Sequence, residues 1–265
     1  MQNKKSIPVL ILCGGRGIRL AGEASYIPKA MVRIGQRPIL WHVMKRFANY
    51  GYSKFILALG TKGEMIRDYF LNYSSYTDDI RITLGSGSAE HLSAHQEEAW
   101  EITMVDTGEQ ANSGARIARC KQYVEAKEFM LTYSDNLANI NLIKLLEFHH
   151  DKGMVATVTC AIAPYREQEL QVDDGVVIGH FDPTKAKSQE RYINGGYMVF
   201  TNKIFSYLSA FNECRLESDV FERLMKEKQL ALYPHHGFWR WLDTDRDYEY
   251  LNNLANDNKA SWLAE

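Results

Sequence analysis

Residues 7–13 (IPVLILC) form a short apolar run that leads directly into the glycine-rich residues 14–17 (GGRG). A short apolar run that ends in turn residues is typical of a strand buried on both faces of a parallel sheet. Lys4 and Lys5 loosely resemble the start of a signal peptide, but the run is short, contains Pro8 and lacks a cleavage site of the usual form. No run approaches the ~18 apolar residues of a membrane helix. We therefore expect a buried first strand in a soluble, cytoplasmic protein that binds no membrane.

Outward from this strand, strand-like and helix-like segments alternate up to residue 153. Further strands are predicted at 55–59, 80–84, 102–105 and 128–132, and helices at 38–50, 65–70, 117–124 and 141–150. This alternation indicates a doubly wound, mostly parallel α/β sheet. Predicted strands at 154–162, 175–181 and 192–200, and helices near 203–208, 217–228 and 245–256, indicate a β-rich, antiparallel extension. Because no linker or repeat interrupts the chain, we predict a single domain, 1–265.

The composition is that of an ordinary globular protein, with 265 residues, 45% hydrophobic and 24% charged. The net charge of −2 provides no electrostatic footprint for nucleic acid, so we expect no nucleic-acid partner. Four cysteines, at positions 13, 120, 160 and 214, are far apart and show no CxxC spacing. That spacing favours reduced thiols in the cytosol.

The first candidate site is the loop after strand 7–13, in which Gly14, Gly15 and Gly17 lie beside Arg16 and Arg19. Glycines let main-chain N–H groups approach an anion closely, and guanidinium groups suit phosphate. Neither the dinucleotide-binding GxGxxG nor the P-loop GxxxxGK[ST] fits this spacing. A plain strand-to-loop turn is the alternative interpretation.

Other candidate residues follow later strands. Asp135 comes directly after the predicted strand 128–132, at the sheet edge where open α/β folds bind ligands. Asp243 lies near the C-terminus, and one or two such carboxylates suit Mg²⁺. Lys29 can reach a phosphate from the same edge. The alternatives are an Asx turn for Asp135, a helix N-cap for Asp243 and a surface lysine for Lys29. The glycine pair in 194–196 indicates a close approach by a ligand or by backbone.

The order of these motifs resembles that of the sugar-nucleotide pyrophosphorylases, a family of nucleotidyltransferases that carry GGxGTRL, PKPM, a Gly-Asp after a central strand and a late aspartate. Nearly the whole chain is similar, and the match is closer to the glucose-1-phosphate cytidylyltransferases at 38–44, 85–108, 113–116, 194–196 and 237–247. The resemblance implies a Rossmann-like, doubly wound mixed sheet of the nucleotide-diphospho-sugar transferase type with a β-rich extension. It also implies a nucleotide-binding half (1–153) and an acceptor-binding half (154–265).

The implied reaction is transfer of CMP from CTP to a sugar 1-phosphate such as glucose 1-phosphate, or to a related phosphate or phosphonate, with release of pyrophosphate. The implied cofactor is Mg²⁺ and the implied partner a second copy of the chain, with segment 85–104 as a contact. By the resemblance, the nucleotide-binding residues are Leu12, Gly14, Gly15, Gly17, Arg19, Lys29, Arg116 and Tyr133. The catalytic residues are Arg19, Lys29, Asp135 and Asp243, of which the two aspartates bind the metal. The acceptor-binding residues are Asn194, Gly195, Arg166 and Lys185.

The departures from the family pattern concentrate on the acceptor side. Asn136 replaces a glycine after the metal aspartate, residues 165–168 (YREQ) replace an Arg-Phe-Gly, and 181–185 (FDPTK) stand where the family has Glu-Lys-Pro. Lys185 or Lys187 can take the place of the missing lysine. We therefore predict that glucose 1-phosphate is not the best acceptor. The alternatives are a nucleotidyltransferase that uses another nucleoside triphosphate, and a non-catalytic nucleotide-sugar binding protein.

Overall fold

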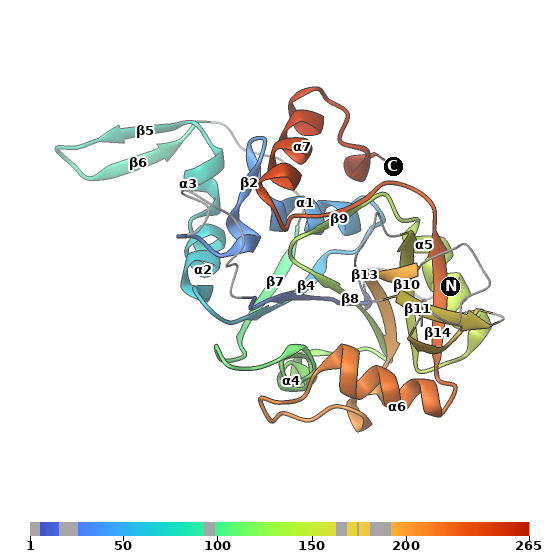
Figure 1. The fold of residues 1–265 in the computed structure, drawn as a ribbon. Helices are drawn as coiled ribbons and strands as arrows, with labels where there is room; N and C mark the ends of the chain where they lie inside the picture. Colours follow the sequence, from blue (N-terminus) through green and yellow to red (C-terminus); the bar gives the residue numbers. More distant parts are fainter. Residues whose placement is uncertain are drawn as a thin grey trace.

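A nine-stranded mixed sheet forms the centre of the molecule in the computed structural model (Figure 1), which describes residues 6–15, 26–92, 99–162, 169–173, 175–180 and 192–264. The strand order is β10-β14-β12-β11-β13-β8-β1-β4-β7. The strands are β1 (Val9–Cys13), β4 (Lys54–Leu59), β7 (Glu101–Asp106), β8 (Glu128–Tyr133), β10 (Ala156–Ile162), β11 (Glu169–Asp173), β12 (Val176–His180), β13 (Tyr192–Thr201) and β14 (Leu230–His235). The predicted mixed α/β class is confirmed.

The parallel half of the sheet is centred on β1. Val9 pairs with Phe55 of β4 on one side and with Met130 of β8 on the other, and β7 adds to β4, all in parallel. Every residue of β1 is buried. Val9, Ile11 and Cys13 pack into one hydrophobic cluster, whereas Leu10 and Leu12 pack into a second. Burial on both faces explains why this stretch is apolar at every position and not at alternate ones.

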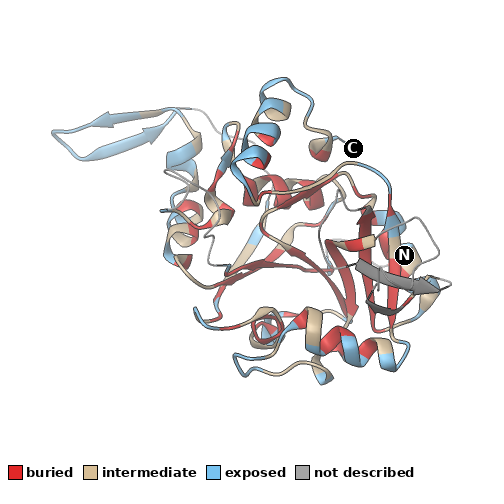
Figure 2. Ribbon diagram, in the orientation of Figure 1, coloured by how far each residue is buried: buried red, intermediate tan, exposed pale blue. Residues whose placement is uncertain are grey.

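Helices cover the two faces of the sheet, so the molecule has three layers (Figures 1 and 2). Helices α1 (Ile39–Ala48) and α5 (Leu142–Lys152) pack on one cluster, and α4 (Ser113–Arg119) and α6 (Phe221–Lys226) on the other. α5 ends at Gly153, whose φ of 61° is the left-handed conformation that glycine favours at a helix end. The predicted helix 117–124 begins earlier, at Ser113, and its last part is a 3₁₀ turn, Lys121–Tyr123. Likewise, the predicted helix 203–208 is the 3₁₀ helix Asn202–Ser206.

The antiparallel half joins the parallel half where β13 pairs with β8. β13 also pairs with β10, and β14, β12 and β11 complete this β-rich part. The predicted β-rich extension after residue 153 is therefore confirmed, and its pairings are antiparallel except that of β10 with β14, which is parallel. A π-helical turn, Leu216–Val220, leads into α6, and α7 (Asp245–Asn256) matches the predicted final helix.

The prediction that 80–84 continues the βα alternation is wrong. This segment is strand β5 (Ile80–Thr83), which forms a hairpin with β6 (Ser88–His91) after the short helices α2 (Gly63–Leu71) and α3 (Tyr73–Thr77). The hairpin projects from the body (Figure 1), and all four residues of β6 are exposed. A hairpin turn at Gly87, with φ of 68°, reverses the chain before it can reach the sheet.

Two further pairs of strands lie outside the main sheet. β2 (Arg33–Ile34) pairs with β3 (Arg37–Pro38), and β9 (Asn136–Ala138) pairs with β15 (Trp239–Trp241). None of the described helices has the length and apolar character needed to cross a bilayer.

Candidate active site

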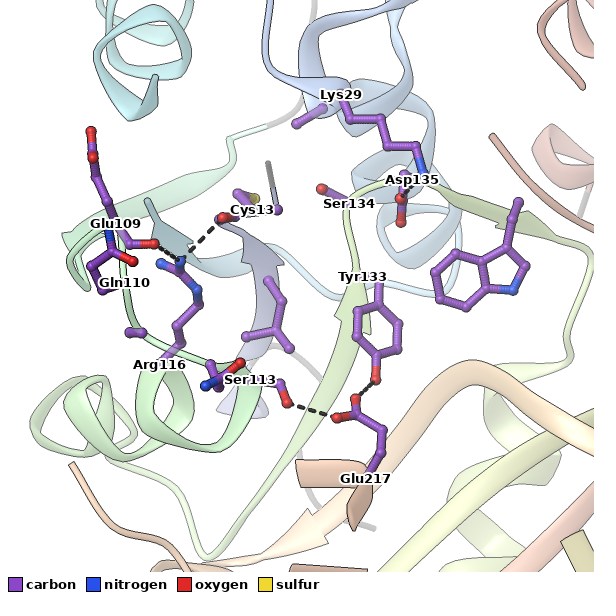
Figure 3. A pocket seen from close by; sticks show the side chains of 17 residues that line it. Cys13, Lys29, Glu109, Gln110, Ser113, Arg116, Tyr133, Ser134, Asp135 and Glu217 are labelled. Carbon is purple, nitrogen blue, oxygen red and sulfur yellow. Dashed lines mark hydrogen bonds and ion pairs between the residues drawn. The ribbon is translucent and has the colours of Figure 1, made fainter. Parts of the chain in front are cut away.

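A cleft of about 670 Å³ opens at the carboxyl ends of β1 and β8 (Figure 3). This is the edge at which open α/β sheets bind ligands. Its lining comes from loops that follow β1, β7 and β8, from the Lys29–Met31 3₁₀ turn, from α4, from the π-helical turn Leu216–Val220 and from β15. The residues are Leu12, Cys13, Gly14, Gly15, Lys29, Ala30, Glu109, Gln110, Ala111, Asn112, Ser113, Arg116, Tyr133, Ser134, Asp135, Glu217 and Trp241.

The β9–β15 pair brings the two predicted metal ligands together. Trp241 lies opposite Asn136, and the Leu242 N–H donates to the Asp135 carbonyl at 2.9 Å. Asp135 precedes β9 and Asp243 follows β15, so this register places residues 108 positions apart beside each other. Lys29 Nζ contacts both carboxylates, at 2.8 Å from Asp135 Oδ2 and in a short contact with Asp243 Oδ1.

The cation and the two carboxylates are shielded from solvent to a large degree. The exposed side-chain fractions are 16% for Lys29, 15% for Asp135 and 24% for Asp243. Burial disfavours the charge on Lys29, but the attraction of Asp135 and Asp243 outweighs it and raises the lysine pKa. Burial raises the pKa of Asp135, and Lys29 offsets part of that shift. The lysine is therefore a permanent cation at this point.

The interpretation of Asp243 as a helix N-cap is wrong. Thr244 caps α7: its hydroxyl accepts the Asp247 N–H at 3.2 Å, and Asp247 Oδ2 accepts the Thr244 N–H at 3.0 Å. Arg240 Nε donates to the other carboxylate oxygen of Asp247 at 2.7 Å. This capping box anchors the chain immediately after Asp243 and leaves the Asp243 side chain directed to Lys29.

Arg116 lines the cleft and is buried, with only 4% exposure. Its guanidinium donates to the carbonyls of Leu59, Gly108, Gly14 and Glu109 and to the Thr107 hydroxyl, at 2.7–3.3 Å. Burial lowers the pKa of Arg116, yet a guanidinium stays charged in proteins. Arg116 therefore ties the ends of β1, β4 and β7 together, and its charge lies beside the predicted nucleotide site.

Gly14 and Gly15 follow β1, and a side chain at these two positions would meet different surroundings. A Cβ on Gly14 would lie 2.1 Å from Arg116 Cζ, and one on Gly60 would lie 2.4 Å from Arg116 Nη1. A Cβ on Gly15, which lines the cleft, would meet no described atom within 4 Å. Gly14 thus makes room for the arginine. The predicted phosphate ligands Gly17 and Arg19 lie outside the described residues.

Leu12 and Tyr133 line the cleft, as the resemblance implies, and Tyr133 belongs to a network that the sequence motifs do not mark. Its phenol donates to Glu217 in a short hydrogen bond, and the Ser113 hydroxyl donates to the other Glu217 oxygen at 2.7 Å (Figure 3). Burial, with Glu217 adding to it, raises the pKa of Tyr133 well above its ordinary value, so the phenol remains a donor. Glu217 lies at the start of a predicted helix, and no sequence signal distinguishes it from a solvent-exposed helix residue.

Two of the predicted acceptor residues, Asn194 and Gly195, lie on β13. The Gly195 carbonyl accepts from the Asn136 amide and from Trp239 Nε1, and a Cβ on Gly196 would lie 2.2 Å from Asn136 Nδ2. A Cβ on Gly195 would lie 3.1 Å from the Thr159 carbonyl oxygen, so the main chain of β10 explains this glycine, whereas the Asn136 side chain and a φ of 79° explain Gly196. Asn194 is half-buried, and its side chain hydrogen bonds to Tyr133. The other two predicted acceptor residues, Arg166 and Lys185, lie outside the described residues.

The donor set fits Mg²⁺. Mg²⁺ takes one or two protein carboxylates and completes its shell with water and phosphate oxygens, and Lys29 shows that Asp135 and Asp243 can share one cation. Within the described ranges, no group of three or more histidine, cysteine or acidic side chains forms a metal cluster. A closed structural zinc site is therefore not built from these residues.

Comparison with known proteins assigns the chain to a family. The nucleotidyl transferase family model matches residues 8–258, which include β1, the cleft and Asp243. This chain belongs to the nucleotidyl transferase family. The family and the enzyme class that the motifs predict are thereby confirmed.

Two relatives match almost end to end. The probable glucose-1-phosphate cytidylyltransferase of Bacillus subtilis (strain 168) is 38% identical over 253 residues, which cover 96% of this chain and 98% of the relative. The glucose-1-phosphate cytidylyltransferase of Salmonella typhi is 34% identical over 254 residues, which cover 96% and 97%.

Solved structures share the fold. HddC from Yersinia pseudotuberculosis superposes with a TM-score of 0.73 at 20% identity, covering 93% of this chain and 98% of its own. The inositol-1-phosphate CTP transferase from T. maritima superposes with a TM-score of 0.68 at 15% identity, covering 93% and 95%. At these identities the similarity concerns the fold.

Proposed function

We propose that this chain is a cytidylyltransferase, which transfers CMP from CTP to a small phosphorylated acceptor and releases pyrophosphate. The observation that carries the proposal is that Lys29 lies between the carboxylates of Asp135 and Asp243. Lys29 and the main chain of Gly15 line the same cleft. A cation, two carboxylates for a metal and an open glycine backbone are the parts that phosphoryl transfer uses. The full-length relatives, both named as cytidylyltransferases, support the choice of CTP.

The chemistry needs positioning more than it needs a base. An oxygen of the acceptor phosphate attacks the α-phosphorus of CTP, a new P–O bond forms, and the bond from the α-phosphorus to the bridging oxygen of pyrophosphate breaks. Because the attacking phosphate is already anionic, no protein group has to remove a proton. Lys29 supplies a fixed positive charge to the oxygens around the α-phosphorus, and alignment within the cleft contributes the rest.

We further propose Mg²⁺ as the cofactor, with Asp135 and Asp243 as its ligands. Among the described residues that line the cleft, the carboxylates of Glu109, Asp135 and Glu217 outnumber the cations of Lys29 and Arg116. A triphosphate therefore requires additional positive charge to enter this cleft. When bound, Mg²⁺ would neutralise charge on the phosphates.

The loop between β7 and α4 supports a preference for cytosine. It contributes Glu109 and Gln110 to the cleft wall, and their oxygens can accept from the exocyclic amine of cytosine. Uracil presents an acceptor at the same position, so a site built around acceptors leaves polar groups unpaired with UTP.

On the acceptor side, we propose that glucose 1-phosphate is not the best substrate. Asn136 replaces the family glycine, and its side-chain amide donates a hydrogen bond to the Gly195 carbonyl. Glu217, held by Tyr133 and Ser113, offers carboxylate oxygens in the cleft to a hydroxylated acceptor. Segments 165–168 and 181–185, where the sequence departs from the family, belong to the same half.

A pyrophosphate-release assay tests the proposal. CTP, UTP, ATP and dTTP are each supplied with Mg²⁺ and a panel of sugar 1-phosphates, polyol phosphates and phosphonates. We expect turnover with CTP. We also expect that at least one other acceptor has a higher catalytic efficiency than glucose 1-phosphate. Comparable efficiency with UTP contradicts the base preference. Nucleotide binding without turnover on any acceptor instead favours the non-catalytic alternative.

We also propose that the chain acts in the cytoplasm as a homo-oligomer. None of its four cysteines, all within the described residues, forms a disulfide, which suits a reducing compartment. The β5–β6 hairpin leaves Ile82 at 60% and Leu84 at 90% exposure on an arm that projects from the body, a surface suited to a second copy. Light scattering after size exclusion tests this: Leu84→Ser is expected to reduce the assembly, and an unchanged mass contradicts the contact.

A further inference from the structure

Lys29 lies where a metal bound by the same two oxygens of Asp135 and Asp243 would lie. Its Nζ is 2.8 Å from Asp135 Oδ2 and in short contact with Asp243 Oδ1, so one oxygen of each carboxylate converges on a single ammonium. Two carboxylates this close, about four-fifths shielded from water, repel each other unless a cation lies between them. Among the described residues, the cation between them is Lys29.

A divalent cation and the Lys29 ammonium cannot use the same two oxygens together. Mg²⁺ binds oxygen at about 2.0–2.1 Å, closer than any hydrogen-bonded nitrogen, so it would occupy the space between the carboxylates. Two cations at that separation also repel each other. The ammonium must therefore leave at least one of the two oxygens when the metal enters.

The main chain around Lys29 is fixed, so the side chain has to make this movement. The 3₁₀ turn is closed by Met31 N–H to the Pro28 carbonyl at 2.8 Å and by Val32 N–H to the Lys29 carbonyl at 3.1 Å. Ala30 and Val32 are 2% exposed in the core. The flexible four-carbon stem can carry the ammonium by a few ångströms, and the Lys29 side chain borders the cleft (Figure 3).

We propose that Lys29 is a displaceable internal counter-cation. It neutralises Asp135 and Asp243 while no divalent cation is bound, and entry of the cation frees its ammonium for the phosphates of the nucleotide. This inference rests on the proposed function, since it takes Asp135 and Asp243 as metal ligands. Its consequence is that the lysine opposes binding of the free metal although it assists the reaction.

The test measures binding of Mn²⁺ alone, without nucleotide or acceptor, by electron paramagnetic resonance and by calorimetry. Wild type is compared with Lys29→Met. Lys259→Met is the matched control, because Lys259 also forms an ion pair, at 3.1 Å with Asp257, but on the exposed surface. We expect Lys29→Met to bind Mn²⁺ about tenfold more tightly than wild type, the equivalent of one charge-assisted hydrogen bond. Lys259→Met should bind as wild type does.

Thermal stability provides a second readout. Without metal, Lys29→Met should melt below wild type, and saturating Mn²⁺ should restore more of the melting temperature in the variant than in wild type. If Lys29→Met does not fold, Lys29→Gln replaces it, because it also removes the charge. The added Asp243→Asn substitution in the Lys29→Met background should abolish the gain in affinity.

Equal or weaker Mn²⁺ binding by the charge-removing variant overturns the proposal. That result leaves the proposed function intact, because the pyrophosphate-release assay on wild type tests the reaction independently. Conversely, Lys29→Met can bind Mn²⁺ more tightly while wild type shows no turnover in the pyrophosphate-release assay. That result supports the displacement of Lys29 by the metal and rejects only the assigned reaction.

Discussion

Gly14 and Gly15 are neighbours with different steric demands. A Cβ on Gly14 would collide with the Arg116 guanidinium, whereas one on Gly15 would meet no atom of the described residues within 4 Å. We expect Gly14→Ala to lower the free energy of unfolding by about 1–3 kcal/mol, because the guanidinium must leave its carbonyl acceptors. Gly15→Ala should change it by less than about 0.5 kcal/mol. Urea denaturation of both variants checks this, and equal losses would contradict the role assigned to Arg116.

At the reacting centre, we expect Asp135→Asn and Asp243→Asn each to abolish turnover, because each removes charge from the metal site. Lys29→Ala should reduce the turnover number by about a hundredfold, as the loss of one aligned electrostatic donor does. Steady-state kinetics at saturating Mg²⁺ measure both effects. Asp257→Asn, on an exposed ion pair, is the control. A near-native rate for either active-site aspartate variant would remove that residue from the metal site.

At the scale of elements, the start of α7 determines where Asp243 lies. Thr244→Ala removes the capping hydroxyl and should lower the free energy of unfolding by about 1 kcal/mol. Because Asp243 is adjacent, this substitution should also reduce the turnover number about tenfold. Asn141→Ala removes the equivalent cap of α5, where Asn141 Oδ1 accepts the Lys144 N–H at 3.0 Å. It should cost similar stability and leave turnover unchanged. If both variants lose activity equally, the effect of the α7 cap is on stability alone.

At the scale of the whole molecule, two buried histidines make stability depend on pH. His42 bonds to the Ile34 carbonyl at 2.8 Å and to Trp262, and His149 bonds to the Thr157 hydroxyl at 2.8 Å. Burial lowers the pKa of both to about 4 from an ordinary 6.5. The unfolded chain therefore takes up protons at a higher pH than the folded chain does.

It follows that the free energy of unfolding is highest above pH 6.5 and falls as the pH drops towards 4. Protonation of each histidine should lower the free energy of unfolding by up to about 3 kcal/mol between pH 6.5 and pH 4. Urea denaturation at pH 7, 6 and 5 measures the slope. His149→Gln should reduce this slope, and an unchanged slope would show that folding does not shift the pKa of His149.

Much of the fold and part of the site could be predicted from the sequence because the signals are local. The stretch 7–13 is apolar because both faces of β1 are buried. Helix α5 ends at Gly153, which adopts a φ of 61°. The position of Asp135 after β8 follows from a motif within a few residues. The near-full-length match to the nucleotidyl transferase family also arises from the order of such motifs.

The tertiary structure alone decided which distant residues meet. Antiparallel pairing of β9 with β15 joins Asp135 to Asp243, and neither strand is long enough to have a recognisable period. The glycine at position 14 depends on an arginine that reaches it from α4, and Glu217 joins the cleft only because the π-helical turn lies beside Tyr133. A strand-like pattern at 80–84 does not determine which strand will pair with it, and there the partner is the adjacent β6. Periodicity reports the environment of each residue along its own element, whereas contacts between elements depend on how the whole chain packs.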